Sequence, residues 1–218
     1  MSNQLLLTGM VIRSAPSAEY DRRIVLLTKE RGRITAFARG ARRPKSSLLA
    51  ATSPFSFGTF TLYEGATAYT LAQADIREYF TAVREDLEAS CYGAYFMEMA
   101  DYYARENLDA SQMLNLLYIS LKALEKPTLE KRLIRRIFEI RLMVINGEFP
   151  YEAAQGSELH ESAAYAISYS IRAPLQKLFT FRVTPEVLRQ IETVTEKIRQ
   201  KTIDKPMHSL EVLQSVCE

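Results

Sequence analysis

The chain has 218 residues, of which 47% are hydrophobic and 25% charged, and its formal net charge is +2. This composition is typical of a folded protein and excludes a disordered or fibrous one, and the length suits one large or two small domains. No apolar run approaches the ~18 residues of a membrane span and the first residues lack the basic leader of a secretion signal, so we expect a cytoplasmic protein.

The charge is unevenly distributed along the chain. Residues 1–80 hold 11 Lys and Arg against 6 Asp and Glu, whereas residues 81–218 hold 17 against 20. Between Arg13 and Lys45 the difference sharpens to 10 basic against 3 acidic residues. Such a local field attracts phosphate backbones, although an ordinary solvated basic surface would account for it equally well.

Short segments rich in β-branched and aromatic residues, each bounded by turn residues, predict five strands near the N-terminus. They cover residues 5–13, 23–28, 33–38, 55–63 and 68–76. Five strands in so short a stretch indicate a closed barrel, with the nucleic-acid-binding OB-fold as the first candidate and an SH3-like barrel as the second. Residues 48–52 could form a helical turn between the third and fourth strands.

From residue 81 the apolar period changes from two to about 3.6, which predicts helices as far as the C-terminus. We expect them at residues 82–105, 110–125, 128–146, 158–170, 173–180, 185–203 and 208–217, with a loop at 147–157. Thr184 is an expected N-cap, Pro127 and Pro185 are expected first-turn prolines, and Gly147 is an expected helix stop. The expected fold class is therefore α+β, with an OB-fold domain at residues 1–80 and an all-helical domain at residues 81–218.

The residues that enzyme active sites need are scarce. The chain contains two histidines and two cysteines, too few for a four-cysteine zinc site. His160 and Glu161 begin a zinc-protease pattern, but Ala164 stands where the second histidine ligand would be. The chain also lacks a phosphate-binding loop, a nucleophile elbow and a dinucleotide fingerprint. We therefore expect no enzyme activity, no cofactor and no metal site, and regard a hydrolase as the weakest hypothesis.

The third predicted strand carries the clearest binding pattern. Alternation places Arg33, Phe37 and Arg39 on one face, so that two guanidinium groups flank an aromatic ring. Cations that neutralise phosphates beside a ring that stacks on bases are typical of single-strand binding. In a barrel, however, only one strand face is core, and Phe37 could instead belong to that core.

The loop after this strand carries three further cations, Arg42, Arg43 and Lys45. Because Pro44 alone restricts the backbone there, the loop could reach phosphates without strain. We predict that the DNA-binding residues are Arg33, Phe37, Arg39, Arg42, Arg43 and Lys45. Basic loops are common on soluble proteins, so the loop alone is a weak indication.

Three features stand out in the helical part. One helix face carries a continuous aromatic and apolar stripe, which favours a central core helix over a base-stacking platform. The stripe consists of Tyr92, Tyr95, Phe96, Met99, Tyr102 and Tyr103. Arg132, Arg135 and Arg136 form a basic strip that a solvated helix face would explain. Arg141 differs, because its helical neighbours are apolar and its guanidinium needs an anion, either an internal carboxylate or an acidic peptide.

The sequence resembles the RecO family of bacterial DNA-repair and recombination mediators. The most specific match is RGARRPKS at residues 39–46. Other similar segments are GMVIRS at 9–14, LTKERGR at 27–33, PF at 54–55, LAQAD at 71–75, REDL at 84–87, FEIRL at 138–142, APLQKLF at 173–179 and HSLEVL at 208–213. They occur in the family's order and span nearly the whole chain.

The resemblance implies an OB-fold followed by a helical domain. It implies binding of single- and double-stranded DNA, ATP-independent annealing, and partnership with RecR and single-stranded-DNA-binding protein in loading RecA. It also implies a nucleoid-associated protein and an acidic partner tail at Arg141, helped by Arg132, Arg135 or Arg136. An adaptor that acts through its helical domain, with weak nucleic-acid binding, is the alternative hypothesis.

The sequence departs from the family at one place. Many members carry four zinc-binding cysteines in the region corresponding to residues 147–162, and this chain has none there. We therefore expect the protein to fold and function without zinc.

Overall fold

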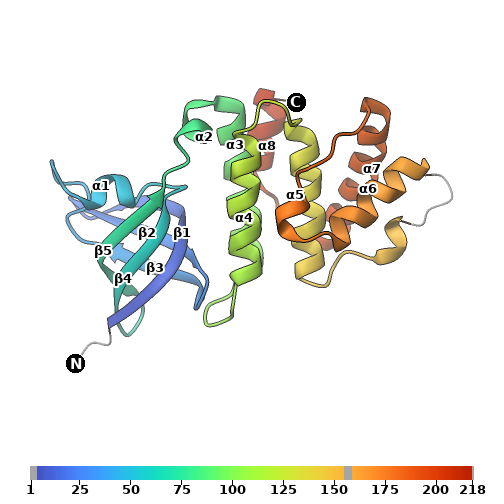
Figure 1. The fold of residues 1–218 in the computed structure, drawn as a ribbon. Coiled ribbons are helices and arrows are strands. Elements are labelled where there is room, and N and C mark those ends of the chain that lie inside the picture. The colour runs from blue at the N-terminus through green and yellow to red at the C-terminus, as the bar shows by residue number, and fades with distance from the viewer. Residues whose placement is uncertain (1–3, 155–158, 218) are drawn as a thin grey trace. The chain divides into compact units, whose positions relative to one another are not determined.

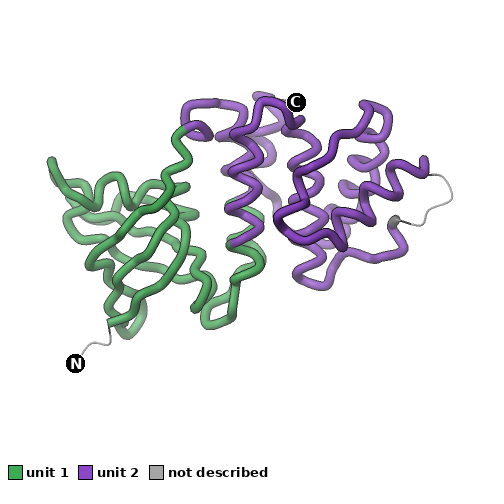
Figure 2. The backbone as a smooth tube through the Cα atoms, viewed as in Figure 1, with its two compact units in different colours: residues 1–81, 97–114 green, residues 82–96, 115–218 purple. Residues whose placement is uncertain are grey.

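The computed structural model describes residues 4–154 and 159–217. Figure 2 divides the chain into two compact units. One unit contains residues 1–81 and 97–114, and the other contains residues 82–96 and 115–218. The first unit is built around a β-barrel, and we call it the barrel unit. The second is helical, and we call it the helical unit.

Five strands close the barrel in the order β1-β2-β3-β5-β4 (Figure 1). They are β1 (Gln4–Ser17), β2 (Asp21–Thr28), β3 (Gly32–Ala38), β4 (Phe57–Glu64) and β5 (Tyr69–Glu78), with the short helix α1 (Leu48–Ala51) between β3 and β4. All neighbouring strands are antiparallel except β3 and β5, which pair in parallel. This order, with a helix after the third strand, confirms the predicted OB-fold.

Alternate residues of the strands fill the barrel. One buried apolar cluster contains Ile24 and Leu26 of β2, Ile34 and Ala36 of β3, and Phe60 of β4. In β3, burial alternates strictly along the strand from Gly32 to Ala38. The opposite face of β3, which carries Arg33, Thr35 and Phe37, therefore points out of the barrel.

Residues 97–114 belong to the barrel unit because they attach to the β2–β3 turn. The amides of Asn107 and Ala110 donate to the carbonyls of Arg31 and Lys29, at 2.9 and 3.1 Å. Gly32 permits this approach, because a Cβ there would lie 2.0 Å from the carbonyl oxygen of Arg105. Its φ of +61° is also one that favours glycine.

The remaining elements are helices, as the change of period predicts. They are α2 (Thr81–Glu85), α3 (Leu87–Tyr103), α4 (Ser111–Leu124), α5 (Lys131–Ile145), η1 (Tyr151–Ala154), α6 (Glu161–Arg172), η2 (Leu175–Lys177), α7 (Pro185–Thr202) and α8 (His208–Cys217). Helices α5, α6 and α7 pack against one another in the helical unit. In the same unit, Phe96 stacks on Phe138 with ring centroids 4.2 Å apart.

The predicted helix ends are partly right. The Thr184 hydroxyl accepts a hydrogen bond from the amide of Val187, with Pro185 in the first turn. Gly147 follows the end of α5 with a φ of +74°, which confirms the predicted stop. The prediction for Pro127 is wrong, because α5 begins at Lys131 and Pro127 lies in the preceding turn. Part of the predicted 147–157 loop lies outside the described residues, and the rest contains η1.

The α+β class is thus confirmed. The predicted aromatic stripe is core at Tyr92, Tyr95, Phe96 and Met99, which are fully buried, whereas Tyr102 and Tyr103 are half-buried. The division into domains at 1–80 and 81–218 stays a prediction. Strands give way to helices between Glu78 and Thr81, but the compact barrel unit also includes residues 97–114.

Candidate nucleic-acid interface

Phe37 lies on the outer face of the barrel. Its neighbours Ala36 and Ala38 are fully buried inside, whereas Phe37 itself is half-buried. This arrangement settles one alternative, since the ring does not belong to the barrel core. An outward ring on an OB-fold strand is a surface on which a base can stack.

Arg23 is a residue that the sequence patterns did not single out. It lies opposite Phe37 in the antiparallel β2–β3 ladder and is exposed. Directly paired side chains on one sheet face have Cβ atoms ~5 Å apart, so the Arg23 side chain begins beside the outward ring. Arg23 begins a predicted strand, and its outward position follows from the same alternation that places Ile24 inside.

Arg33, at the other end of the β3 outer face, is paired within the barrel unit. Its Nε donates to the carboxylate of Asp101, and Nη2 of Arg13 lies 3.1 Å from the second oxygen of the same group. The Asp101 side chain is 9% exposed, whereas those of Arg13 and Arg33 are 50% and 36% exposed. One carboxylate therefore holds two arginines that remain partly open to solvent.

The 39–46 loop is tied to the β1–β2 turn, and it is more ordered than the sequence suggests. The Gly40 amide donates to Oδ1 of Asp21 at 2.7 Å, and the Arg42 amide donates to the carbonyl of Tyr20 at 2.8 Å. The Arg43 guanidinium lies over the Tyr20 ring, 5.7 Å from its centroid. These contacts fix the loop that carries the cations against the β1–β2 turn.

The cations of this barrel end are available to a ligand. Arg39, Arg42, Arg43 and Lys45 are all exposed. Within residues 4–154 and 159–217, the side chains of Arg23, Arg39 and Lys45 make no hydrogen bond or ion pair. Arg42 donates to the carbonyl of Glu19 at 3.3 Å, which leaves its charge uncompensated. We call Arg23, Phe37, Arg39, Arg42, Arg43 and Lys45 together the open basic face.

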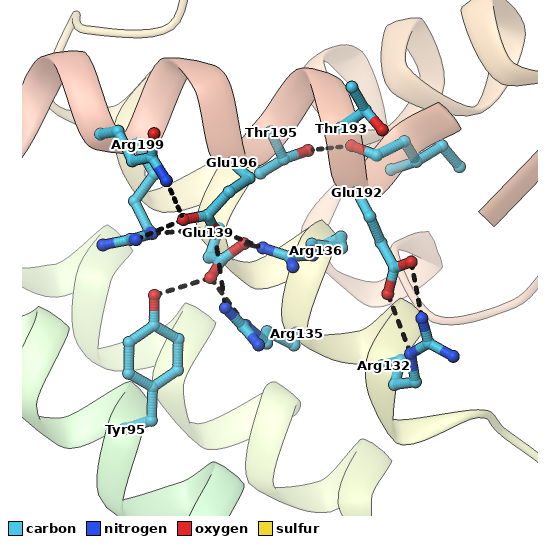
Figure 3. Close-up of polar contacts among 12 residues, drawn as sticks. Tyr95, Arg132, Arg135, Arg136, Glu139, Glu192, Thr193, Thr195, Glu196 and Arg199 are labelled. Carbon is cyan, nitrogen blue, oxygen red and sulfur yellow. Dashed lines mark hydrogen bonds and ion pairs between the residues drawn. The ribbon is translucent and has the colours of Figure 1, made fainter. Parts of the chain in front are cut away.

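The basic strip of α5 is not a solvated face, so that interpretation is wrong for two of its three members. Arg135 is fully buried and Arg136 is 7% exposed, and both donate to the buried carboxylate of Glu139 (Figure 3). Nη1 of Arg136 also lies 3.2 Å from Glu196 of α7. Only Arg132 lies at the surface, where it forms a bidentate pair with Glu192.

This buried cluster holds its charges by mutual compensation. Burial alone would raise the pKa of Glu139, but the charges of Arg136 and Arg135 and the Tyr95 hydroxyl outweigh it and hold that pKa below its usual value. Burial and the charge of Glu139 raise the pKa of Tyr95 well above its usual value. The Tyr95 ring also lies against the Arg135 guanidinium, 5.2 Å from its centroid. The cluster joins three helices and has the character of a structural network.

Among the described residues, Arg141 does not contact the internal carboxylate that was one of its two expected anions. Its Nη1 donates to the carbonyl of Ile171 and lies 3.5 Å from that of Ser170, at the C-terminal end of α6. These last carbonyls of a helix carry partial negative charge and lack intrahelical partners, so a guanidinium satisfies them. Burial lowers the pKa of Arg141.

Comparison with known proteins identifies the family. The family description "Recombination protein O N terminal" matches residues 1–80, and "Recombination protein O C terminal" matches residues 84–153. A protein of Acetivibrio thermocellus named DNA repair protein RecO is 30% identical over 98% of both chains.

The chain belongs to the RecO family. Two further RecO proteins match about two thirds of it. That of Alkaliphilus metalliredigens is 38% identical over 66% of this chain and 58% of its own length, and that of Bacillus subtilis is 31% identical over 65% and 55%. The family match covers residues 1–80 and 84–153, and the similarity to the Acetivibrio thermocellus protein extends over 98% of the chain.

In the described residues, no group of three His, Cys, Asp or Glu side chains is placed to hold a metal ion. None of the helices in that part of the chain is long and apolar enough to cross a bilayer.

Proposed function

We propose that this RecO-family protein is a non-enzymatic DNA-binding mediator, which binds single- and double-stranded DNA through the open basic face. The observation that carries the proposal is the set of uncompensated cations around Phe37. Arg23 stands beside the ring, and Arg39 follows it along the chain. The loop with Arg42, Arg43 and Lys45 continues the cationic surface.

The chemistry of this face suits a nucleic-acid strand. Exposed cations gain free energy by releasing counterions from phosphates, whatever the sequence of the DNA. An outward aromatic ring adds stacking worth ~1 to 3 kcal/mol per base without choosing among bases. A strand held by its backbone keeps its base edges accessible, which supports ATP-independent annealing.

The direct test is DNA binding by the full chain as a function of salt concentration. Replacing Arg42, Arg43 and Lys45 together by alanine should lower the slope of log K against log salt by about 2 to 3 units, because each cation contributes about one. Affinity should fall about equally for different sequences. A matched control replaces Lys197, Lys201 and Lys205 in the helical unit, which removes the same charge and should leave the slope unchanged.

Phe37→Leu separates stacking from charge. This variant should weaken single-stranded DNA binding with the salt slope intact, since no cation is lost. If the triple alanine variant keeps the wild-type slope, the loop does not contact DNA. If the wild-type chain does not bind DNA at all, the proposed function is wrong.

The proposed partners are RecR, single-stranded-DNA-binding protein and, indirectly, RecA. We place the acidic tail of single-stranded-DNA-binding protein near Arg132 and Arg141. Arg135 and Arg136 contribute to this site only indirectly, by holding the helix in place through their cluster with Glu139. Calorimetric titration of an acidic tail peptide into wild type, Arg132→Ala and Arg141→Ala tests this placement. Equal affinities in three folded proteins would exclude both residues.

An adaptor role is the second candidate, and one groove favours it. Helix α6 and residues 180–184 line a groove of about 610 Å³ that contains Tyr165, Tyr169 and Phe181. The Tyr165 side chain is 69% exposed, and exposed aromatic residues are common anchors in protein interfaces. If the adaptor role dominates, Tyr165→Ala should weaken RecR or single-stranded-DNA-binding protein binding more than the loop variant does.

A further inference from the structure

The Asp101 contact is the starting point for a second binding site on the barrel. Arg13 comes from β1 and Arg33 from β3, the two strands on either side of β2. In the ladders, Arg13 lies opposite Val25 and Arg33 lies opposite Leu27. Two guanidinium groups thus converge over β2 from both sides, and the Asp101 carboxylate lies between them.

The carboxylate occupies this place as a phosphate would. Each of its two oxygens faces a different guanidinium, as two non-bridging phosphate oxygens could. The two arginines carry one more positive charge than Asp101 compensates. They are also the partly exposed members of the group, whereas the carboxylate is covered.

The attachment of residues 97–114 does not depend on this ion pair. The amides of Arg33, Asn107 and Ala110 form backbone hydrogen bonds of 2.9 to 3.2 Å across the contact. Nη1 of Arg31 adds a side-chain bond to Oδ1 of Asn107 at 2.9 Å. Removing the charge of Asp101 should therefore leave this segment in place.

Part of the site lies on the same strand face as Phe37 of the open basic face. Arg33 and Phe37 share the outer face of β3, and four residues of strand span about 13 Å. Thr35 lies between them on the same face. A strand that stacks on Phe37 and runs along β3 reaches Arg33 next.

We propose that Arg13 and Arg33 form a second phosphate site, and that Asp101 competes with DNA for it. The proposal rests on the proposed DNA-binding function and deepens it. Asp101 then limits the length of the barrel surface along which the DNA strand is bound. It also keeps the affinity for DNA below the value that Arg13 and Arg33 would give without it. A mediator must release its strand, and this internal competitor favours release.

The test is Asp101→Asn, measured by fluorescence anisotropy with a single-stranded oligonucleotide at several salt concentrations. Freeing two cations should steepen the slope of log K against log salt by roughly 1 to 1.5 units and tighten binding about three- to tenfold at low salt. Asp109→Asn is the matched control, because Asp109 is an exposed acid of the same segment whose partner is Ser111. It removes the same charge without touching Arg13 or Arg33.

A second set of variants keeps the test independent of Asp101 alone. Arg13→Gln with Arg33→Gln should weaken DNA binding strongly in the Asp101→Asn background and only slightly in the wild-type background. Circular dichroism and thermal unfolding confirm that each variant is folded. If the double substitution has the same effect in both backgrounds, Asp101 does not compete with DNA.

The outcomes separate this inference from the proposed function. If wild type binds DNA and Asp101→Asn has the same DNA affinity and salt slope as Asp109→Asn, the inference is wrong and the proposed function stands. Wild type that does not bind DNA overturns the function. If Asp101→Asn is unfolded, the double arginine substitution in the wild-type background still tests the inference. A strong loss of DNA binding there would count against it, because Asp101 would already occupy both arginines.

Discussion

Two pairs of adjacent arginines have opposite environments in this protein. Arg42 and Arg43 are exposed in a loop of the barrel unit. Arg135 and Arg136 lie inside the helical unit, at 0% and 7% exposure. The sequence motif is the same, so adjacency of arginines does not indicate whether they bind a ligand.

The difference is explained by the carboxylates within reach. On a helix, residues three and four apart are neighbours, and Glu139 stands in that relation to both Arg136 and Arg135. Glu196 of α7 supplies a second carboxylate. In the loop, by contrast, Arg42 and Arg43 meet a backbone carbonyl and an aromatic ring, which leave their charge available.

Removing the buried carboxylate should produce the largest effect. Glu139→Gln leaves two buried guanidinium groups undercompensated, so the free energy of unfolding should fall by about 3 to 5 kcal/mol. Urea denaturation measures it. Glu192→Gln breaks only the surface pair with Arg132 and should cost about 0.2 to 1 kcal/mol. Equal losses would mean that the buried cluster contributes no more than a surface ion pair.

The pH dependence should reveal the same cluster. Burial would raise the pKa of Glu196, but hydrogen bonding and the charges of Arg199 and Arg136 lower it to about 2. A carboxyl whose pKa is lower in the folded state stabilises the protein above its unfolded pKa. This contribution, up to about 3 kcal/mol, should disappear as the pH falls from about 4.5 to about 2. Over that range wild type should lose more stability than Glu196→Gln. A constant difference between them would contradict the assignment.

Arg141 tests a third environment, the end of a helix. Arg141→Met keeps much of the apolar stem but leaves the carbonyls of Ile171 and Ser170 without their donor, at a cost of about 1 to 2 kcal/mol. Thermal unfolding measures the loss. Arg172→Met, in the exposed last turn of α6, is the control and should change stability by no more than about 0.5 kcal/mol. A similar change in both variants would show that the contact is dispensable.

The smallest effect on stability is expected at the loop. Arg43→Ala removes an exposed cation–π contact with Tyr20, which is worth about 0.5 to 1 kcal/mol. The same variant should lower the DNA salt slope by about one unit. Denaturation and anisotropy on one preparation compare the two effects. A large loss of stability would place Arg43 with the buried arginines.

The barrel was predictable because its determinants are local. Turn residues bound each strand, and alternation in β3 separates Ile34, Ala36 and Ala38 from the outward side chains. The alternation also separated Phe37 from these residues, but it did not show which face was the core. The pairing of Arg33 with Asp101 could not be predicted in this way, because it joins residues 68 positions apart.

The helical unit was less predictable for a related reason. A periodic pattern predicts a helix with one exposed face, but α5 is buried from Leu133 to Ile140 because neighbours surround it. Its arginines then need internal partners, and Glu139 at i+3 and i+4 was the available indication. The partner of Arg141 had no local indication, since the Ile171 carbonyl lies 30 residues later in the chain.

The discontinuous barrel unit has a consequence for synthesis on the ribosome. The last strand is complete at Glu78, but the segment that bonds to Lys29 and Arg31 is not translated until residues 107–110. Domains generally fold as units while the chain emerges, N-terminal parts first. An early nascent barrel would therefore expose Arg13 and Arg33 without Asp101. This nascent barrel would be more basic and less stable than the barrel unit of the finished protein. Its final surface would form only when residues 97–114 pack onto it.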